Sequence, residues 1–187
     1  MASALRGCAP RTHPATVDTN VLRSLLQSVH YRQSTVFAFV LGNPRPVFTP
    51  YQLSLLSEYL PRAFEQALPQ EVIYFRLRDE PDGLRRTIGW CFLIDSELHL
   101  VLEEIRQPMV QPKELAPQPI AKRWELVPQP GQRRFVSRSK GAPEPNWFIL
   151  PLPDSPPLSR AIPRSGSVPH RFQPFLPMVM ARPVRSS

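Results

Sequence analysis

Three strand-like segments in the middle of this 187-residue chain constrain its fold more than any other feature. They are Glu71–Arg78, Thr87–Ile94 and Glu97–Glu103, separated by turns at Asp79–Gly83 and Asp95-Ser96. The second segment is apolar on both faces, as is typical of a central strand. Asp-Gly supplies the backbone conformation that a hairpin reversal needs. The pattern therefore predicts an antiparallel meander of three strands.

Two helices are expected on the N-terminal side of the meander. The first has a stripe of apolar residues, from Val21 to Val29, on one helical face, and Asp18 or Thr19 is suited to cap it. The second opens at Thr49-Pro50, where proline at the first helical position loses no needed hydrogen bond. Its apolar stripe continues in phase across Pro61, which predicts a kinked rather than a divided helix.

The fold class that follows is α+β. We expect a small antiparallel sheet of about four strands, the fourth formed by Val36–Leu41, with two helices covering one face. The rest of the chain, on its C-terminal side, is expected to be a long, proline-rich and largely irregular region.

Proline and charge both mark a boundary near residue 107. Of the 25 prolines, 17 lie from Pro108 onward. Residues 1–106 are electrically neutral, so the net charge of +8 arises entirely from the remainder. We therefore divide the chain into an N-terminal segment (1–13), an α+β domain (14–106), a proline-rich extension (107–150) and a disordered basic tail (151–187).

Two apolar islands in the extension are suited to dock on the domain. They are Arg123–Val127 and Asn146–Leu150, each of which contains a tryptophan. Burial of one tryptophan contributes a few kcal/mol through its apolar area, about enough to hold an edge strand.

The N-terminal segment contains a candidate lipidation site at Cys8. Leu5-Arg6-Gly7-Cys8 resembles a bacterial lipobox, although Arg6 stands where a small or apolar residue is usual. Only seven residues precede Cys8, which leaves no room for the apolar core of a signal peptide. The hypothesis therefore requires a start codon upstream of Met1. The alternative is a chance match of four residues.

A cluster of cations in the extension is the candidate polyanion-binding site. Arg133, Arg134, Arg138 and Lys140 fall within eight residues, beside Phe135. Such a cluster attracts nucleic acid, anionic lipid or the phosphates of the bacterial envelope. The alternative is a solvated region with no specific partner.

The sequence contains no pattern that indicates catalysis, a metal site or a cofactor. Phosphate loops, nucleophile elbows and paired metal ligands are missing. Cys91 is expected to be a small buried side chain. His99 is expected to face solvent or a neighbouring polar group, and adjacent Glu103 and Glu104 are expected on opposite faces of a strand. These observations favour a protein that is not an enzyme.

Three segments together resemble a group of uncharacterised proteobacterial envelope lipoproteins. The first is His13-Pro14 with Thr16-Val17, the second is a Phe-Thr-Pro helix with its leucine stripe over residues 48–72, and the third is the turn-linked pair at 90–102. The resemblance covers roughly residues 13–150. It implies a location in the envelope, which agrees with the lipobox-like sequence, and it implies no activity or catalytic residues.

The favoured interpretation is a non-enzymatic, lipid-anchored protein of the bacterial cell envelope that contacts anionic surfaces or lipid phosphates. The alternative is a cytoplasmic protein that binds nucleic acid through its basic C-terminal region. Nucleic acid is a partner only in the cytoplasmic case.

Overall fold

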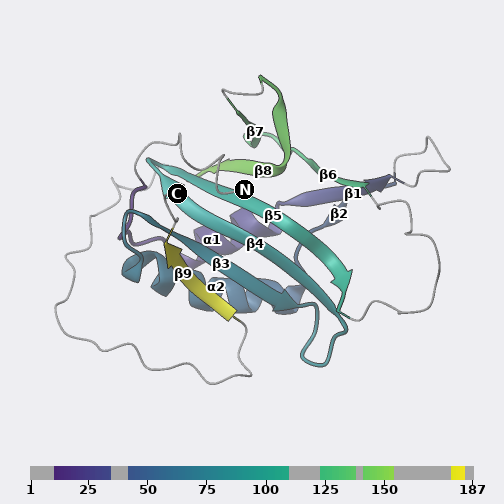
Figure 1. The fold of residues 1–187 in the computed structure, drawn as a ribbon, viewed down its shortest axis with the longest axis horizontal. Coiled ribbons are helices and arrows are strands. Elements are labelled where there is room, and N and C mark those ends of the chain that lie inside the picture. Colours follow the sequence, from purple (N-terminus) through teal and green to yellow (C-terminus); the bar gives the residue numbers. More distant parts are fainter. Residues whose placement is uncertain (1–10, 35–41, 110–122, 138–140, 154–177, 184–187) are drawn as a thin grey trace.

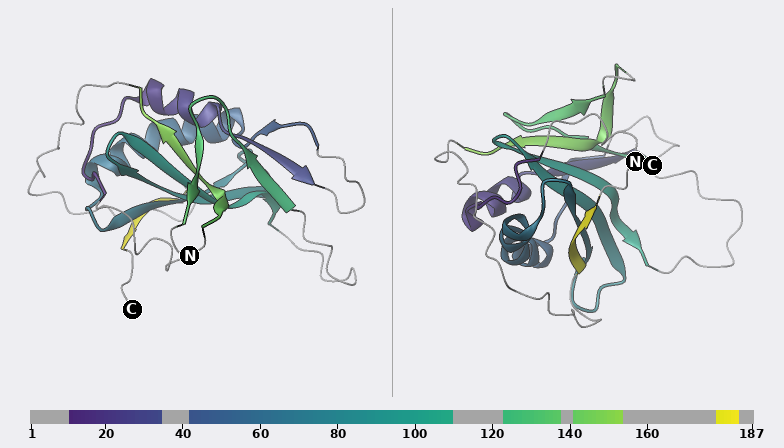
Figure 2. Two further views of the ribbon diagram at one scale, coloured as in Figure 1. Left: turned by 90° about the horizontal axis from the view of Figure 1, so that it is seen from above. Right: turned by 60° about the vertical axis from the view of Figure 1, so that its left-hand side comes forward.

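The computed structural model describes residues 11–34, 42–109, 123–137, 141–153 and 178–183. These residues form two helices and two antiparallel sheets, and the helices cover one face of the larger sheet (Figures 1 and 2). The α+β class is confirmed, but there are more strands than the four expected. The additional strands come mainly from the proline-rich region, which the sequence pattern marked as irregular.

The larger sheet has six strands in the order β7-β8-β5-β4-β3-β9. Its centre is the predicted meander, with Trp90 of β4 opposite both Tyr74 of β3 and Val101 of β5. The strand bounds are β3 Glu71–Arg78, β4 Arg85–Ile94, β5 Glu97–Pro108, β7 Arg133–Val136, β8 Pro143–Pro151 and β9 Met178–Pro183.

Strand β8 shows how a proline-rich segment joins a sheet. It pairs with β5 on one side and β7 on the other, so it is an interior strand and not the edge strand expected. Its prolines lie toward its two ends, where a missing backbone N–H costs the ladder least. Between them Trp147 and Phe148 are buried, one on each face of the sheet.

Within residues 151–187, which were expected to be disordered, Met178–Pro183 instead form strand β9. Met178–Pro183 pair with Glu71–Arg76 along the free edge of β3. Residues 154–177 and 184–187 lie outside the described residues. A strand here is explained by the unpaired backbone groups that an edge strand offers to any extended segment nearby.

The smaller sheet has three strands in the order β2-β1-β6. They are β1 (His30–Ser34), β2 (Arg45–Pro46) and β6 (Arg123–Val127), so the first tryptophan island pairs with β1. The strand expected at Val36–Leu41 lies outside the described residues.

Both helices begin as their sequences predict. In α1 (Thr19–Gln27) the Asp18 carboxylate accepts from two free backbone N–H groups, those of Asn20 and Val21. In α2 (Pro50–Gln66) Thr49 and Gln52 satisfy each other's backbone N–H groups as a capping box. The second helix continues through Pro61 as one element.

The main core lies between the helices and the inner face of the larger sheet. Leu22, Leu56 and Phe64 of the helices pack there with side chains such as Phe75 of β3, and all are fully buried. Gly89 of β4 is part of this contact because a Cβ there would lie 2.6 Å from the Phe75 ring and from the Val101 carbonyl. Only a residue without a side chain fits.

Candidate functional site

A second buried cluster lies on the outer face of the larger sheet, the face turned away from the helices. It consists of Val72, Phe92, Ile94, Val101 and Trp147, with Trp90 and Phe135 packed against it. These residues come from β3, β4, β5, β7 and β8 and share one face because alternate strand residues point the same way. The outer face is thus an aromatic surface that spans most of the sheet.

His99 is buried at the centre of this cluster, with 4% of its surface exposed. Its ring stacks on Phe92, and the Trp147 indole N–H donates to His99 Nδ1 at 3.1 Å. The solvent-facing position expected for His99 is therefore wrong, and the polar group beside the ring is the indole N–H of Trp147. Because Nδ1 accepts, the ring proton of neutral His99 resides on Nε2, which is buried with no hydrogen-bond partner among the described residues.

Burial also determines the charge state of His99. Its pKa is lowered to about 4, chiefly because burial removes hydration; Glu97 and Asp95 raise the pKa and Arg133 lowers it. The imidazole is consequently neutral at pH 7, and its acceptor nitrogen is already occupied by an indole donor. This geometry suits a packing role better than proton transfer.

Residues 11–13 lie beside the end of β4, next to the β4–β5 turn, and their side chains reach both faces of the sheet. The Arg11 guanidinium lies 5.2 Å from the centre of the Phe92 ring, on the outer face. The Thr12 backbone N–H donates to the Leu93 carbonyl at 2.9 Å. His13 then stacks on Phe64 of α2, on the other side of the sheet.

His13 holds this crossing in place from the helix side. It is 2% exposed, and the Leu93 backbone N–H approaches its Nε2 at 3.5 Å. Burial lowers the pKa of His13 to about 4, with a smaller contribution from the Arg11 charge. No structural role for Arg11, Thr12 or His13 was predicted, and His13 entered only through the family resemblance. The one relevant signal in the sequence was that Thr87–Ile94 is apolar on both faces, which requires a cover on each.

The outer face also includes a half-exposed aromatic pair next to two acidic residues. The rings of Tyr74 and Trp90 lie 4.7 Å apart, and the Trp90 indole N–H donates to Glu103 at 2.8 Å. Arg86 donates to Glu104 at 2.9 Å.

Glu103 and Glu104 were expected on opposite faces, and this expectation is wrong. A β-bulge shifts the ladder at this point, so that Ile88 pairs with Glu104 and Gly89 with Leu102, leaving Glu103 as the additional residue. Both carboxylates accept hydrogen bonds from β4: Glu103 from Trp90 and Glu104 from Arg86.

The candidate polyanion-binding residues are only partly described. Arg133 forms two hydrogen bonds with the Glu97 carboxylate, at 2.8 and 2.6 Å. Arg134 donates to the Leu126 carbonyl and lies 3.6 Å from Glu125. Arg138 and Lys140 lie outside the described residues, as does Cys8. Two of the four cations thus have partners within the fold, one on each face of β7.

The described residues also bear on a reactive thiol, a metal site and a membrane-spanning helix. Cys91 is fully buried as expected, and burial raises the pKa of its thiol. Among the described residues, no group of three or more His, Cys, Asp or Glu is arranged to hold a metal ion. No helix in the described part of the chain is long and apolar enough to cross a membrane.

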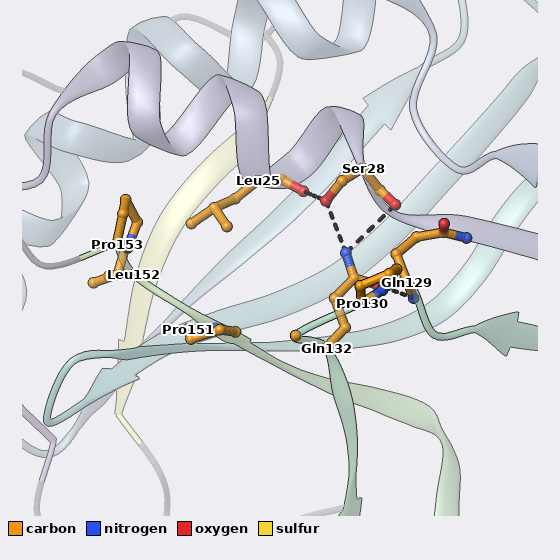
Figure 3. A pocket seen from close by; sticks show the side chains of 9 residues that line it. Leu25, Ser28, Gln129, Pro130, Gln132, Pro151, Leu152 and Pro153 are labelled. Carbon is orange, nitrogen blue, oxygen red and sulfur yellow. Dashed lines mark hydrogen bonds between the residues drawn. The ribbon is translucent and has the colours of Figure 1, made fainter.

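One hollow of about 330 Å³ opens between the end of α1 and the β6–β7 turn (Figure 3). The Gln132 amide bridges it by donating to Ser28 Oγ at 2.7 Å. Its other lining residues are Leu25, Gln129, Pro130, Gly131 and Pro151–Pro153. Because none of these side chains is charged or titratable, the hollow offers apolar contact, amide groups and one hydroxyl.

Comparisons with known proteins found no relative. No family model matches the chain, and no curated protein or solved structure is significantly similar to it.

Proposed function

We propose that this chain is a non-enzymatic protein of the bacterial cell envelope, anchored through a lipid on Cys8. The observation that supports this function best is the fixed path of residues 11–13. Cys8 lies three residues before Arg11, so a lipid attached there would hold the domain close to its membrane. Thr12 and His13 tie this short connection to the β4–β5 hairpin.

The described side chains that could act as acid, base or nucleophile are buried or paired, which supports a role without catalysis. His13 and His99 are neutral and buried at pH 7, and Cys91 is buried with a raised thiol pKa. Glu104 is paired with Arg86 and Glu97 with Arg133. Groups held in this way stabilise a fold, whereas an acid, base or nucleophile needs access to a substrate.

Mass spectrometry of the protein isolated from bacterial membranes tests this proposal. The expected mature chain begins at Cys8 and carries a diacylglyceryl group on its thiol, with or without an N-terminal acyl chain. A Cys8→Ser variant should be released from the membrane fraction. A native chain that retains Met1 and an unmodified Cys8 would contradict the proposal.

The alternative function, nucleic-acid binding in the cytoplasm, depends on the cations of the C-terminal region. Arg133 and Arg134 are held by Glu97 and Glu125, which reduces what they can offer to a phosphate backbone. This alternative is therefore the weaker proposal. Its test is a gel shift with a short RNA or DNA, which should weaken steeply as salt rises if phosphates are bound.

A further inference from the structure

We propose that the edge of β3 is a site of strand exchange, at which the β9 strand of a second copy of this chain takes the place of the chain's own β9. The interaction surface is the edge of β3 beside α2, and the partner is an identical chain. Strand exchange does not depend on the proposed lipid anchor.

Contacts other than those with β9 hold β3 in place. On its inner face Ile73, Phe75 and Leu77 are fully buried in the main core. Along the opposite edge β3 pairs with β4 from Ile73 to Arg78. The edge that β9 covers therefore belongs to a strand that other elements already order. Such an edge presents backbone N–H and C=O groups to any extended segment that pairs with it.

Strand β9 occupies this edge as a bounded segment of six residues. It pairs with Glu71–Arg76 and lies against α2 (Figures 1 and 2). Pro177 precedes the strand in the sequence, and Pro183 is its last residue, where a missing backbone N–H costs the ladder least. Between these prolines every residue has a backbone N–H to donate.

The residue types in β9 suit the limited space on the helix side of the sheet. Ile73 and Phe75 face the helices, so the β9 positions opposite them lie on that side as well. Those positions are Ala181 and Val179, which are small, whereas the larger Met180 falls on the outer face. The edge therefore selects an extended segment with small residues at alternate positions, and β9 of a second copy has the same sequence.

The connection to β9 gives the strand little preference for its own copy. Strands β8 and β9 are consecutive in the chain, but β5, β4 and β3 lie between them in the sheet. Residues 152–177 connect them, whereas most connections in compact domains have about 4–6 residues. Such a tether supplies its strand at an effective concentration of about 1 mM or less. A second copy competes as the protein concentration approaches that value, because it forms the same ladder.

Two single-cysteine proteins test the exchange in the full-length chain. Both carry Cys8→Ser, and Cys91 is protected by burial and by its raised thiol pKa. One carries Arg76→Cys, and the other, labelled with a heavy isotope, carries Met178→Cys at the partner position in the β3–β9 register. A disulfide between these two positions joins different chains, which mass spectrometry identifies as a mixed dimer. The control replaces Arg76→Cys by Arg23→Cys, on the exposed surface of α1.

During mild oxidation at about 1 mM protein, we expect mixed dimers to form at least about tenfold faster with Arg76→Cys than with the Arg23→Cys control. Random collision joins either pair at a similar rate, whereas strand exchange brings only the first pair together. Equal initial rates for the two pairs would overturn the proposal.

Two further substitutions in the Met178→Cys chain test what selects the occupant. Ala181→Leu adds bulk on the helix side and should slow mixed-dimer formation at least about fivefold through overpacking. Met180→Leu, which conserves volume on the outer face, should change the rate by less than about twofold. Equal rates for the two variants would contradict selection by the positions that face the helices.

A shortened connection provides an independent measurement. The register places Met178 four strand spacings across the sheet from Pro151 and about six residues further along it, a separation of about 28 Å. Deletion of residues 154–176 leaves a connection that spans at most about 14 Å. Strand β9 then reaches only the β3 of another copy. We expect this variant to self-associate at micromolar concentration in light scattering, while the full-length chain stays monomeric. A folded, monomeric deletion variant would overturn the proposal.

Discussion

The Asp95 backbone N–H donates to the Thr12 hydroxyl at 2.8 Å, which ties the N-terminal segment to the tip of the β4–β5 hairpin. Asp95 has a positive φ of 51°, as the tight two-residue turn requires. The Thr12 backbone also donates to the Leu93 carbonyl, so a single residue is bonded to the end of β4 and to the first residue of the turn. These two hydrogen bonds of Thr12 form a clamp, four residues after Cys8 in the sequence.

Thr12→Ala should loosen the clamp. The variant leaves the Asp95 N–H without its side-chain acceptor, which costs about 1 kcal/mol of unfolding free energy. Thr12→Ser should retain most of the stability because the hydroxyl remains. Thr16→Ala, at an exposed position nearby, is the control. Hydrogen exchange at Asp95 should accelerate in Thr12→Ala alone, and unchanged exchange there would show that the hydrogen bond does not hold the turn.

The two buried histidines predict a loss of stability in mild acid. Their folded-state pKa values are about 4, below the ordinary value of 6.5, so the unfolded chain binds more protons between these pH values. The free energy of unfolding should therefore be fully present above pH 6.5 and fall as the pH drops toward 4, by about 3 kcal/mol for each imidazole.

Urea titrations from pH 7.5 to 4.5 measure this effect. His99→Gln retains an oxygen that can accept from the Trp147 indole but cannot titrate, so the slope of stability against pH between 4.5 and 6.5 should fall by about half. The same slope in the variant and in the unaltered protein would show that His99 does not contribute to the acid dependence of stability.

The Trp147 indole donor should matter more than that of Trp90. Trp147→Phe leaves His99 with a buried, unsatisfied acceptor and should cost about 1–3 kcal/mol in addition to the lost packing. Trp90→Phe loses a hydrogen bond to the exposed Glu103 and should cost about 1 kcal/mol or less. Chemical denaturation of both variants at pH 7 compares them, and equal costs would argue against the His99 contact.

Gly89→Ala should destabilise the sheet because the added methyl meets the Phe75 ring and the Val101 carbonyl at 2.6 Å. Overpacking of this kind costs about 1–3 kcal/mol. Phe75→Leu removes the ring and should cost less in the Gly89→Ala background than alone. Thermal unfolding of the two single variants and the double variant gives the coupling energy, and strict additivity would show that the two sites do not share space.

Much of the fold could be predicted because its signals are local. The Asp18 cap, the Thr49-Pro50 helix start and the turn at Asp95-Ser96 each depend on residues within a few positions of one another. The meander of β3, β4 and β5 follows from short connections between apolar strands. None of these features requires knowledge of distant parts of the chain.

The candidate site could not be predicted because its contacts join residues far apart in sequence. Trp147 meets His99 48 positions away, and Thr12 meets Asp95 83 positions away. The bulge that brings Glu103 and Glu104 into reach of β4 arises only when β4 and β5 pair. The pairing of β9 with β3 depends on an open sheet edge.

By itself the sequence determined the helices, the central strands and the turns, because these depend on side-chain period and on local backbone preferences. Only the tertiary structure decided what covers the outer face and where the N-terminal segment crosses the sheet. The physical reason is that burial of Phe92, His99 and Trp147 depends on area removed from water by segments that meet only after the chain has folded.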